Sequence, residues 1–209
     1  NLNVTPKPFH PWYGDYGQDS SGECAVPVYH RWFGVGNNND GAALKNNSPF
    51  WYSFSYKNAF IIQMSSEHDF EPGSVQYQWL VANLKSVDRN IYPWVIVTSH
   101  RPSYKSELWA PDRRVADALA AALDPIFLQY KVDLFLTGHY HDYERTCAVT
   151  GWKCVSEDSI GPTGQDPVSR RVYADAVGDA AQTTSAPVHI CVGSAGAWTD
   201  HNGYSGEYW

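Results

Sequence analysis

The 209-residue sequence predicts an α/β fold, and the pattern of its apolar segments supports that class. Continuous apolar runs, as expected for strands buried on both faces, occur in WVIVTSH (94–100) and VDLFLTGH (132–139). A third run, PVHICVG, spans 187–193. Segments with helical periodicity precede and separate the first two runs. Together with an earlier strand, the order strand–helix–strand–helix–strand is typical of an α/β core.

The chain changes character at about residue 50. Residues 1–49 are rich in Gly, Asn, Pro and Ser and show little periodicity, so we expect a loop-rich lead-in. FWYSFSY (50–56) and AFIIQMS (59–65) are aromatic and β-branched runs separated by Lys57 and Asn58. This pattern predicts a β-hairpin.

Two segments carry the spacing of a helix with one apolar face. The first covers 73–89, with Ser74 as its expected N-cap. The second covers 112–130 and contains Pro125, where we expect a break or kink. Residues 155–186 are polar and rich in small residues, which indicates an excursion from the core.

Composition excludes some classes of partner. The net charge of −7 argues against nucleic-acid binding through a basic surface. No apolar run approaches the roughly 18–20 residues that a membrane span requires. With 43% hydrophobic residues, the chain is expected to be globular.

The cysteines favour one disulfide. Cys147 and Cys154 flank AVTGWK, whose Thr-Gly indicates a turn, so two paired strands would bring the sulfurs together. The alternative is two free thiols in a reducing compartment. Cys191 lies in an apolar run and is expected to be a buried thiol, while Cys24 has no obvious partner. N-glycosylation sequons at Asn3 and Asn46 agree with a secreted protein.

Histidines follow two of the predicted buried strands. His100 and His139 end these strands, so they should share one edge of the sheet if the strands are parallel. His141 would point the same way as His139 if the chain stays extended. Gly138 leaves space where an ion could approach. Imidazole is a common ligand of zinc, iron and manganese, and the alternative is ordinary capping or surface histidines.

The remaining histidines fit ordinary roles. His189 lies inside an apolar run and is expected in the core, and His10, His30 and His201 are expected in loops. His68, in SSEHDF, follows a strand and could approach the histidine edge.

The motifs resemble those of the purple acid phosphatases. GHYHDYER (138–145) is similar to the last metal motif of that family, and VTSH (97–100) to its Val-x-x-His motif. HRPSY (100–104) continues as in many members. Further matching segments occur in family order: SGEC (21–24), FWYSF (50–54), SSEHDF (65–70), GSVQYQWL (73–80), SVDR (86–89) and VGSAG (192–196).

The resemblance implies a calcineurin-like metallophosphoesterase fold, an α/β/β/α sandwich. Residues 1–209 would form the carboxy-terminal part of its catalytic domain. The family's amino-terminal motifs, Gly-Asp-x-Gly, Gly-Asp-x-x-Tyr and Gly-Asn-His, do not occur in their expected places. GDYGQ (14–18) reads superficially as the first of them, but it precedes SGEC and follows no apolar strand, so Asp15 is not expected to be a ligand.

The resemblance also implies a two-metal site. His100 and His139 would bind a divalent ion, zinc, manganese or iron, and His141 a ferric ion. The complete protein would hydrolyse phosphate monoesters at acidic pH, in a secreted, extracellular or vacuolar location, whereas this chain alone would be inactive. The alternative is a non-catalytic extracellular module that retains the fold within a larger glycoprotein assembly.

Neighbouring residues have two possible roles each. Glu144 could orient a metal-bound histidine or pair with Arg145. Arg101 and Tyr104 could face the substrate phosphate or serve packing. His68 is a further weak candidate for the chemistry.

Overall fold

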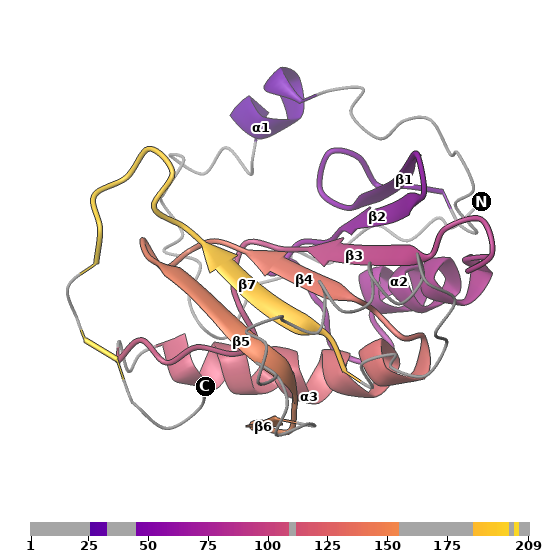
Figure 1. Cartoon of the computed structure of the whole chain (residues 1–209). Coiled ribbons are helices and arrows are strands. Elements are labelled where there is room, and N and C mark those ends of the chain that lie inside the picture. Colours follow the sequence, from indigo (N-terminus) through magenta and orange to yellow (C-terminus); the bar gives the residue numbers. More distant parts are fainter. Residues whose placement is uncertain (1–25, 33–44, 109–111, 155–185, 201–202, 205–209) are drawn as a thin grey trace.

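The computed structural model describes residues 26–32, 45–108, 112–154, 186–200 and 203–204. Their strands form a seven-stranded sheet in the order β1-β2-β3-β4-β7-β5-β6 (Figure 1). The strands are β1 (Tyr52–Tyr56), β2 (Ala59–Gln63), β3 (Trp94–Thr98), β4 (Leu134–Thr137), β5 (Tyr143–Thr150), β6 (Lys153–Cys154) and β7 (Val188–Val192). The helices are α1 (Val26–Arg31), α2 (Val75–Ser86) and α3 (Arg113–Gln129).

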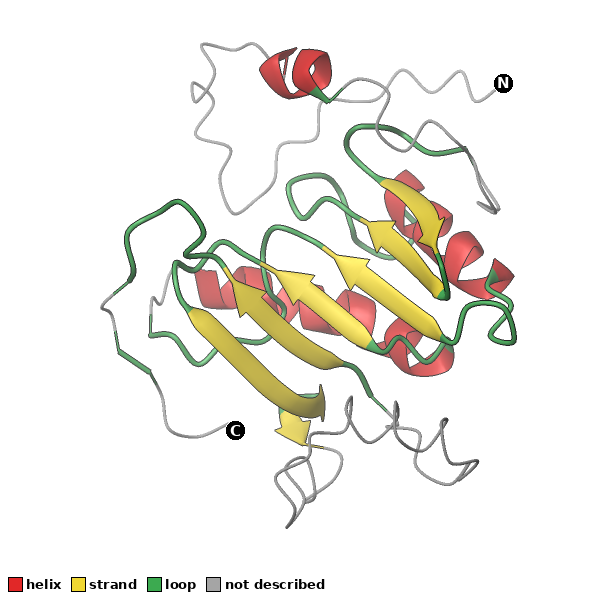
Figure 2. Ribbon diagram, turned by 45° about the horizontal axis from the view of Figure 1, so that its top comes forward, coloured by secondary structure: helices red, strands yellow, loops and turns green. Residues whose placement is uncertain are grey.

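The central strands are parallel. β2, β3, β4 and β7 pair side by side in one direction, and antiparallel β1 and β5 flank them. Helices α2 and α3 lie on the same side of this sheet (Figure 2). The α/β class is therefore confirmed. The strands are shorter than the apolar runs suggested, because residues at one or both ends of each run lie outside the strand pairing.

The predicted hairpin is confirmed between β1 and β2, which pair from Tyr52–Gln63 to Tyr56–Ala59. Lys57 sits in the turn with a φ of 52°, a left-handed conformation that tight turns require. In the lead-in predicted as loop, the described part contains the short helix α1.

Side chains on the helix-facing side of the sheet form the main core. Phe60, Ile62, Val95, Val97 and Phe135 are at most 1% exposed. They pack against apolar side chains that α2 and α3 supply: Trp79, Leu80, Leu84, Leu119, Leu123 and Phe127. Burying each large apolar side chain contributes roughly 1.5–3 kcal/mol, so this layer stabilises the sheet and the orientation of its strand ends.

The other face of the sheet is also apolar but only half-buried. Ile61, Ile96 and Leu134 are neighbours across β2, β3 and β4, and Leu136 and Ile190 continue the row. Alternation of side chains places them opposite the helices. An apolar row that retains this much exposure is typical of a surface that another layer covers.

The helices follow their sequence signals with one correction. Ser74 caps α2, since its Oγ accepts a hydrogen bond from Tyr77 N at 3.1 Å. The break expected at Pro125 is wrong, because α3 runs unbroken from Arg113 to Gln129. Proline removes only the hydrogen bond to Ala121 O, and both residues lie on the exposed side of the helix, where solvent can satisfy that carbonyl.

His189 is a core residue, as expected. It is 3% exposed, its ring packs on Tyr104 and Phe135, and Nδ1 lies 3.3 Å from Ser103 Oγ. Burial lowers the pKa of His189 to about 3. The imidazole is therefore neutral in the folded protein throughout the mildly acidic range.

We expect this histidine to destabilise the intact protein in acid. The folded-state pKa lies below the unfolded value of about 6.5, so the unfolded state binds the extra proton as the pH falls from about 6.5 towards 3. This linkage lowers the free energy of unfolding by about 2 kcal/mol at pH 5. Urea unfolding of His189→Phe should show a shallower acid decline than the unsubstituted protein, with exposed His30→Phe as control. If the unfolding free energies of the two histidine variants fell in parallel with pH, the buried His189 would not be the origin of the acid loss.

The disulfide between Cys147 and Cys154 is present, with the Cα atoms 5.7 Å apart. It joins antiparallel β5 and β6 across the turn at Gly151, whose φ is 56°. The expectation of a paired turn is confirmed. Cys191 is buried and free, as expected, and Cys24 lies outside the described residues.

Non-reducing peptide mapping should recover Cys147 and Cys154 in one linked fragment. Because the bridge closes a loop with a sequence separation of 7, its removal in Cys154→Ser should cost about 2–3 kcal/mol of unfolding free energy. Alkylation of both thiols in native, unreduced protein would contradict the pairing.

The glycosylation expected at Asn46 stays a prediction, and the side chain of this residue is engaged within the fold. Its side chain is 9% exposed, Nδ2 donates to Ser53 O at 3.2 Å, and Oδ1 accepts from Ser53 N at 3.1 Å. A glycan on Nδ2 would have to replace that internal bond. Asn3 lies outside the described residues. None of the described helices is long and apolar enough to cross a membrane.

Candidate metal centre

The parallel sheet brings the three candidate histidines to one edge. His100 follows β3, and His139 and His141 follow β4, its parallel neighbour. The two loops are joined directly, since Gly138 N donates to His100 O at 2.9 Å. This shared edge is what the two strand-end histidines predicted.

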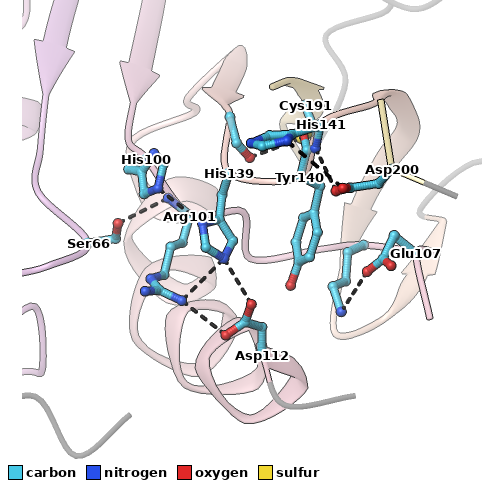
Figure 3. A network of polar contacts seen from close by, with 12 residues as sticks. Ser66, His100, Arg101, Glu107, Asp112, His139, Tyr140, His141, Cys191 and Asp200 are labelled. Carbon is cyan, nitrogen blue, oxygen red and sulfur yellow. Dashed lines mark hydrogen bonds and ion pairs between the residues drawn. The ribbon is translucent and has the colours of Figure 1, made fainter. Parts of the chain in front are cut away.

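His100 and His139 face one another. His139 Nδ1 lies 3.0 Å from His100 Nε2, with ring centroids 4.9 Å apart (Figure 3). Two nitrogens about 2.1 Å from one ion and at a right angle would be about 3.0 Å apart, so this pair fits adjacent ligands of a single cation. Partial burial and the neighbouring His139 lower the pKa of His100, which favours the neutral, metal-binding form.

His139 and His141 do not point the same way, and the expected extended chain is wrong. His139 has a φ of 75°, so the backbone turns between the two residues. The chain is held there by Tyr140, which is 4% exposed, and by Gly193, where a Cβ would lie 1.7 Å from Tyr140 O. A Cβ on Gly138 would make only ordinary contacts, and the approach of an ion there stays a prediction.

His141 turns towards the loop after β7. Its backbone N–H donates to Asp200 Oδ2 at 2.9 Å, and Nδ1 lies 3.9 Å from Asp200 Oδ1 (Figure 3). The ring lies edge-on to Trp198, which is 80% exposed. His141 Nδ1 is buried and has no hydrogen-bond partner within the described part of the chain. A buried nitrogen of this kind is available to a ligand.

The three histidines therefore form two positions. In the described ranges, no group of three or more His, Cys, Asp or Glu residues converges closely enough to hold a metal ion. His100 and His139 make one pair, and His141 stands apart beside Asp200. Neutral imidazole nitrogens in this arrangement fit transition-metal ions, with further ligands required for each.

Arg101 is held by carboxylates. Its Nε donates to Glu67 at 2.9 Å and its Nη1 to Asp112 Oδ1 at 3.0 Å, while its backbone N–H donates to Ser66 Oγ at 3.0 Å. The side chain is 14% exposed. Burial would raise the pKa of Glu67, but the bond and charge of Arg101 lower it overall. These contacts favour the packing role considered for Arg101, and a contact with the substrate phosphate stays a prediction.

Asp112 joins this network to a candidate ligand. Its Oδ2 lies 2.8 Å from His139 Nε2, and both side chains are about one-fifth exposed, 21% and 22%. The residue immediately precedes α3. Figure 3 shows His139 between His100 and Asp112.

The other candidates lie in structural positions. Tyr104 is 1% exposed and donates its hydroxyl to Asp124, and burial raises its pKa, so its contacts favour the packing role considered for it. His68 contacts Phe50 and Trp51, and its Nδ1 lies 2.8 Å from Ser65 Oγ. Burial lowers the pKa of His68.

Glu144 is 7% exposed and accepts a hydrogen bond from Ser106 N at 2.6 Å. It thus anchors the loop after β3. His30 is exposed on α1, as expected for an ordinary surface histidine, and His10, Asp15 and His201 lie outside the described residues.

Sequence reasoning missed Asp112 and Asp200. Asp112 lies between His100 and His139 in the chain, and Asp200 lies far beyond His141, so only the parallel order of β3, β4 and β7 brings both carboxylates to the same edge. The one available signal was that each carboxylate lies in a connection that starts at a strand end on this edge.

Comparison with known proteins gives several relatives, although no protein-family model matches the chain. "Probable inactive purple acid phosphatase 9" of Arabidopsis thaliana is 32% identical over 155 residues, covering 70% of this chain and 24% of the relative. A "Nucleotide pyrophosphatase/phosphodiesterase" of Hordeum vulgare is 33% identical over 150 residues, covering 70% and 39%. "Purple acid phosphatase 1" of Ipomoea batatas is 38% identical over 104 residues, covering 50% and 22%.

A solved structure shares the fold. It is a purple acid phosphatase from yellow lupin (Lupinus luteus) seeds, matched with a TM-score of 0.66 and 24% sequence identity over 96% of this chain and 31% of that one. The chain thus spans between 22% and 39% of the length of the three curated relatives.

Proposed function

Since the chain is a purple acid phosphatase-like sequence that resembles the carboxy-terminal region of those proteins, we propose that it supplies part of a two-metal phosphoesterase site. Its relatives support a phosphoesterase class of hydrolase. The finer proposal is hydrolysis of phosphate monoesters at acidic pH by the intact protein. The observation that carries it is the His100–His139 nitrogen pair at 3.0 Å, with His141 on the same edge.

The proposed ligand assignment follows the two histidine positions. His100 and His139 would hold the divalent ion, zinc, manganese or iron, and His141 would hold a ferric ion. The Nδ1 of His141, which is buried and has no hydrogen-bond partner in the described residues, supports a separate second position. Two cations bound here would hold the phosphoester and lower the pKa of a bound water.

The chain's own residues would hold this site in shape. Arg101 N–H and Ser66 Oγ tie the loop after β3 to the loop after β2. Asp200 accepts from His141 N and so positions the turn that separates the two histidines. Trp198, exposed beside His141, offers apolar surface to the organic part of a substrate.

The half-buried face of the sheet supports a missing partner layer. Ile61, Ile96, Leu134, Leu136 and Ile190 form an apolar row opposite the helices. We propose that residues 1–209 are the carboxy-terminal part of the catalytic domain, that 1–49 lead into it, and that the amino-terminal part covers this row. The coverage of the relatives agrees with such a division.

Location and substrate belong to the same proposal. The Cys147–Cys154 disulfide supports an oxidising location, secreted, extracellular or vacuolar. The name of the barley relative makes nucleotide phosphoesters a class to include in assays.

A second candidate is a non-catalytic extracellular module that retains the fold. It is favoured by the relatives whose names contain the words "probable inactive". In that case the strand-end histidines would serve structure alone, as the contacts of His139 with Asp112 and Arg101 illustrate.

Metal analysis and an activity assay of the intact protein distinguish the candidates. The enzyme should contain iron and a second metal, hydrolyse an aryl phosphate and a nucleotide at mildly acidic pH, and lose activity when a chelator strips the metals. Protein that is folded, free of bound metal after supplementation and inactive would favour the non-catalytic module.

A further inference from the structure

We propose that Asp112 is a positioning residue for His139, which holds the ring so that Nδ1 faces His100 and is free to bind the divalent ion. The inference rests on the proposed function for the identity of the bound group. It adds a carboxylate that lies in none of the matched sequence motifs, at the start of α3.

The contacts define how Asp112 acts. The two carboxylate oxygens of Asp112 have different partners. Oδ1 accepts a hydrogen bond from Arg101 Nη1 at 3.0 Å, and Oδ2 lies 2.8 Å from His139 Nε2. Arg101 is held in turn by Glu67 at 2.9 Å. The carboxylate therefore cannot rotate away from His139 without losing an ion pair with a side chain that is 14% exposed.

The close carboxylate of Asp112 determines which ring nitrogen of His139 carries the proton. An oxygen of Asp112 at 2.8 Å requires a donor, so Nε2 carries the hydrogen. Arg101 Nη1 also lies 3.3 Å from Nε2, but it can only donate, and Asp112 Oδ1 offers it a nearer acceptor at 3.0 Å. His139 Nδ1 is then an unprotonated acceptor, directed at His100 Nε2, 3.0 Å away.

Asp112 acts through the imidazole and does not reach the ion position itself. The two ring nitrogens lie on different sides of the imidazole, and His139 separates Asp112 from His100 (Figure 3). Carboxylates that accept from a metal-bound histidine fix its orientation and raise its basicity, and their removal typically lowers metal affinity roughly 10- to 100-fold.

The test compares Asp112→Ala and Asp112→Asn in the intact protein. Asparagine keeps the shape of the side chain but lacks the charge, so the Asp112→Asn protein should bind Zn²⁺ about 10-fold more weakly in chelator competition. The Asp112→Ala protein should bind Zn²⁺ up to about 100-fold more weakly. Long-range ¹H–¹⁵N NMR of the metal-free protein should show His139 protonated on Nε2, with that population reduced in Asp112→Ala.

Asp117→Asn is the matched control. Asp117 lies on α3 and pairs with Arg113 at 3.2 Å, but both side chains are largely exposed, 50% and 41%. Its substitution should change neither the Zn²⁺ affinity nor the tautomer of His139. Thermal unfolding of every variant separates a loss of positioning from a loss of folding, and Asp112→Asn provides the milder variant if alanine disturbs the helix start.

The outcomes are distinct. Zn²⁺ affinities within about 2-fold of the control, or an unchanged Nε2 proton in Asp112→Ala, would overturn the inference. Loss of Zn²⁺ with an unchanged tautomer would overturn it too, since it would make Asp112 a ligand itself. If the intact protein binds no metal, the proposed function fails, but the NMR measurement on metal-free protein still decides whether Asp112 orients His139.

Discussion

Replacing His139 with alanine in the intact protein is expected to remove the divalent ion and to lower phosphoester turnover by about 1,000-fold or more. A metal ion stabilises developing charge by several kcal/mol, and about 4 kcal/mol corresponds to roughly 1,000-fold in rate. His100→Ala should act alike, because the two nitrogens, 3.0 Å apart, would share one ion. Metal content by elemental analysis and steady-state kinetics measure the two effects.

His141→Ala should differ in which metal is lost. Its ring is directed at the Asp200 side, so this variant should lose iron and keep more of the divalent ion. Exposed His30→Ala on α1 is the control and should change neither metal. Full activity with unchanged metal content in His139→Ala would rule out the assignment.

Residues 1–209 expressed alone are expected to show no phosphatase turnover and to aggregate. In the described residues the site contains histidines in two separate positions and no group that could hold a metal on its own. The apolar row that includes Ile96 and Leu134 would also face water, and exposed patches of this kind promote association. Refolding with iron and zinc, light scattering and an aryl phosphate assay at mildly acidic pH test the expectation.

Two neighbouring residues of β3 provide a matched pair for the aggregation. Ile96→Gln lies on the half-buried face and should make the isolated chain more soluble with little loss of folding. Val97→Gln lies in the helix-facing core, where the side chain is fully buried, and should unfold it. A monomeric, metal-loaded and active fragment would contradict the proposal that a partner layer is required. Asp15 would then be the first residue to examine as a ligand.

The local structure was largely readable from the sequence. The central strands follow from continuous apolar runs, which supply both the core face towards the helices and the half-buried apolar row opposite them. The β1–β2 hairpin, the Ser74 cap and the Cys147–Cys154 bridge follow from turn and cap chemistry that acts over only a few residues. The neutral core position of His189 follows from its apolar neighbours along the chain.

A parallel order of β3 and β4 was favoured by the helical segment between them, whereas the pairing of β4 with β7 was not predicted. That order brings His100 and His139 to one edge, and the motifs around them identify the family that the chain resembles. Both inferences depend on patterns within short segments. They therefore needed no knowledge of which distant side chains meet.

Only the tertiary structure decided which partners the individual polar side chains contact. Tyr104 is paired with Asp124 in the core, Arg101 is held between Glu67 and Asp112, and Asn46 is bound to Ser53. Hydrogen-bond partners of this kind are selected by the packing of segments far apart in the chain. Their sequence neighbours carry no trace of that choice.

The direction of His141 was likewise decided in three dimensions. By itself the sequence determined that His139 and His141 follow one buried strand, two residues apart. It did not determine the φ of 75° at His139, which is unfavourable for a residue with a Cβ. That conformation persists because Tyr140 is buried and Gly193 from the loop after β7 leaves room for its carbonyl, so long-range packing separates the two histidines.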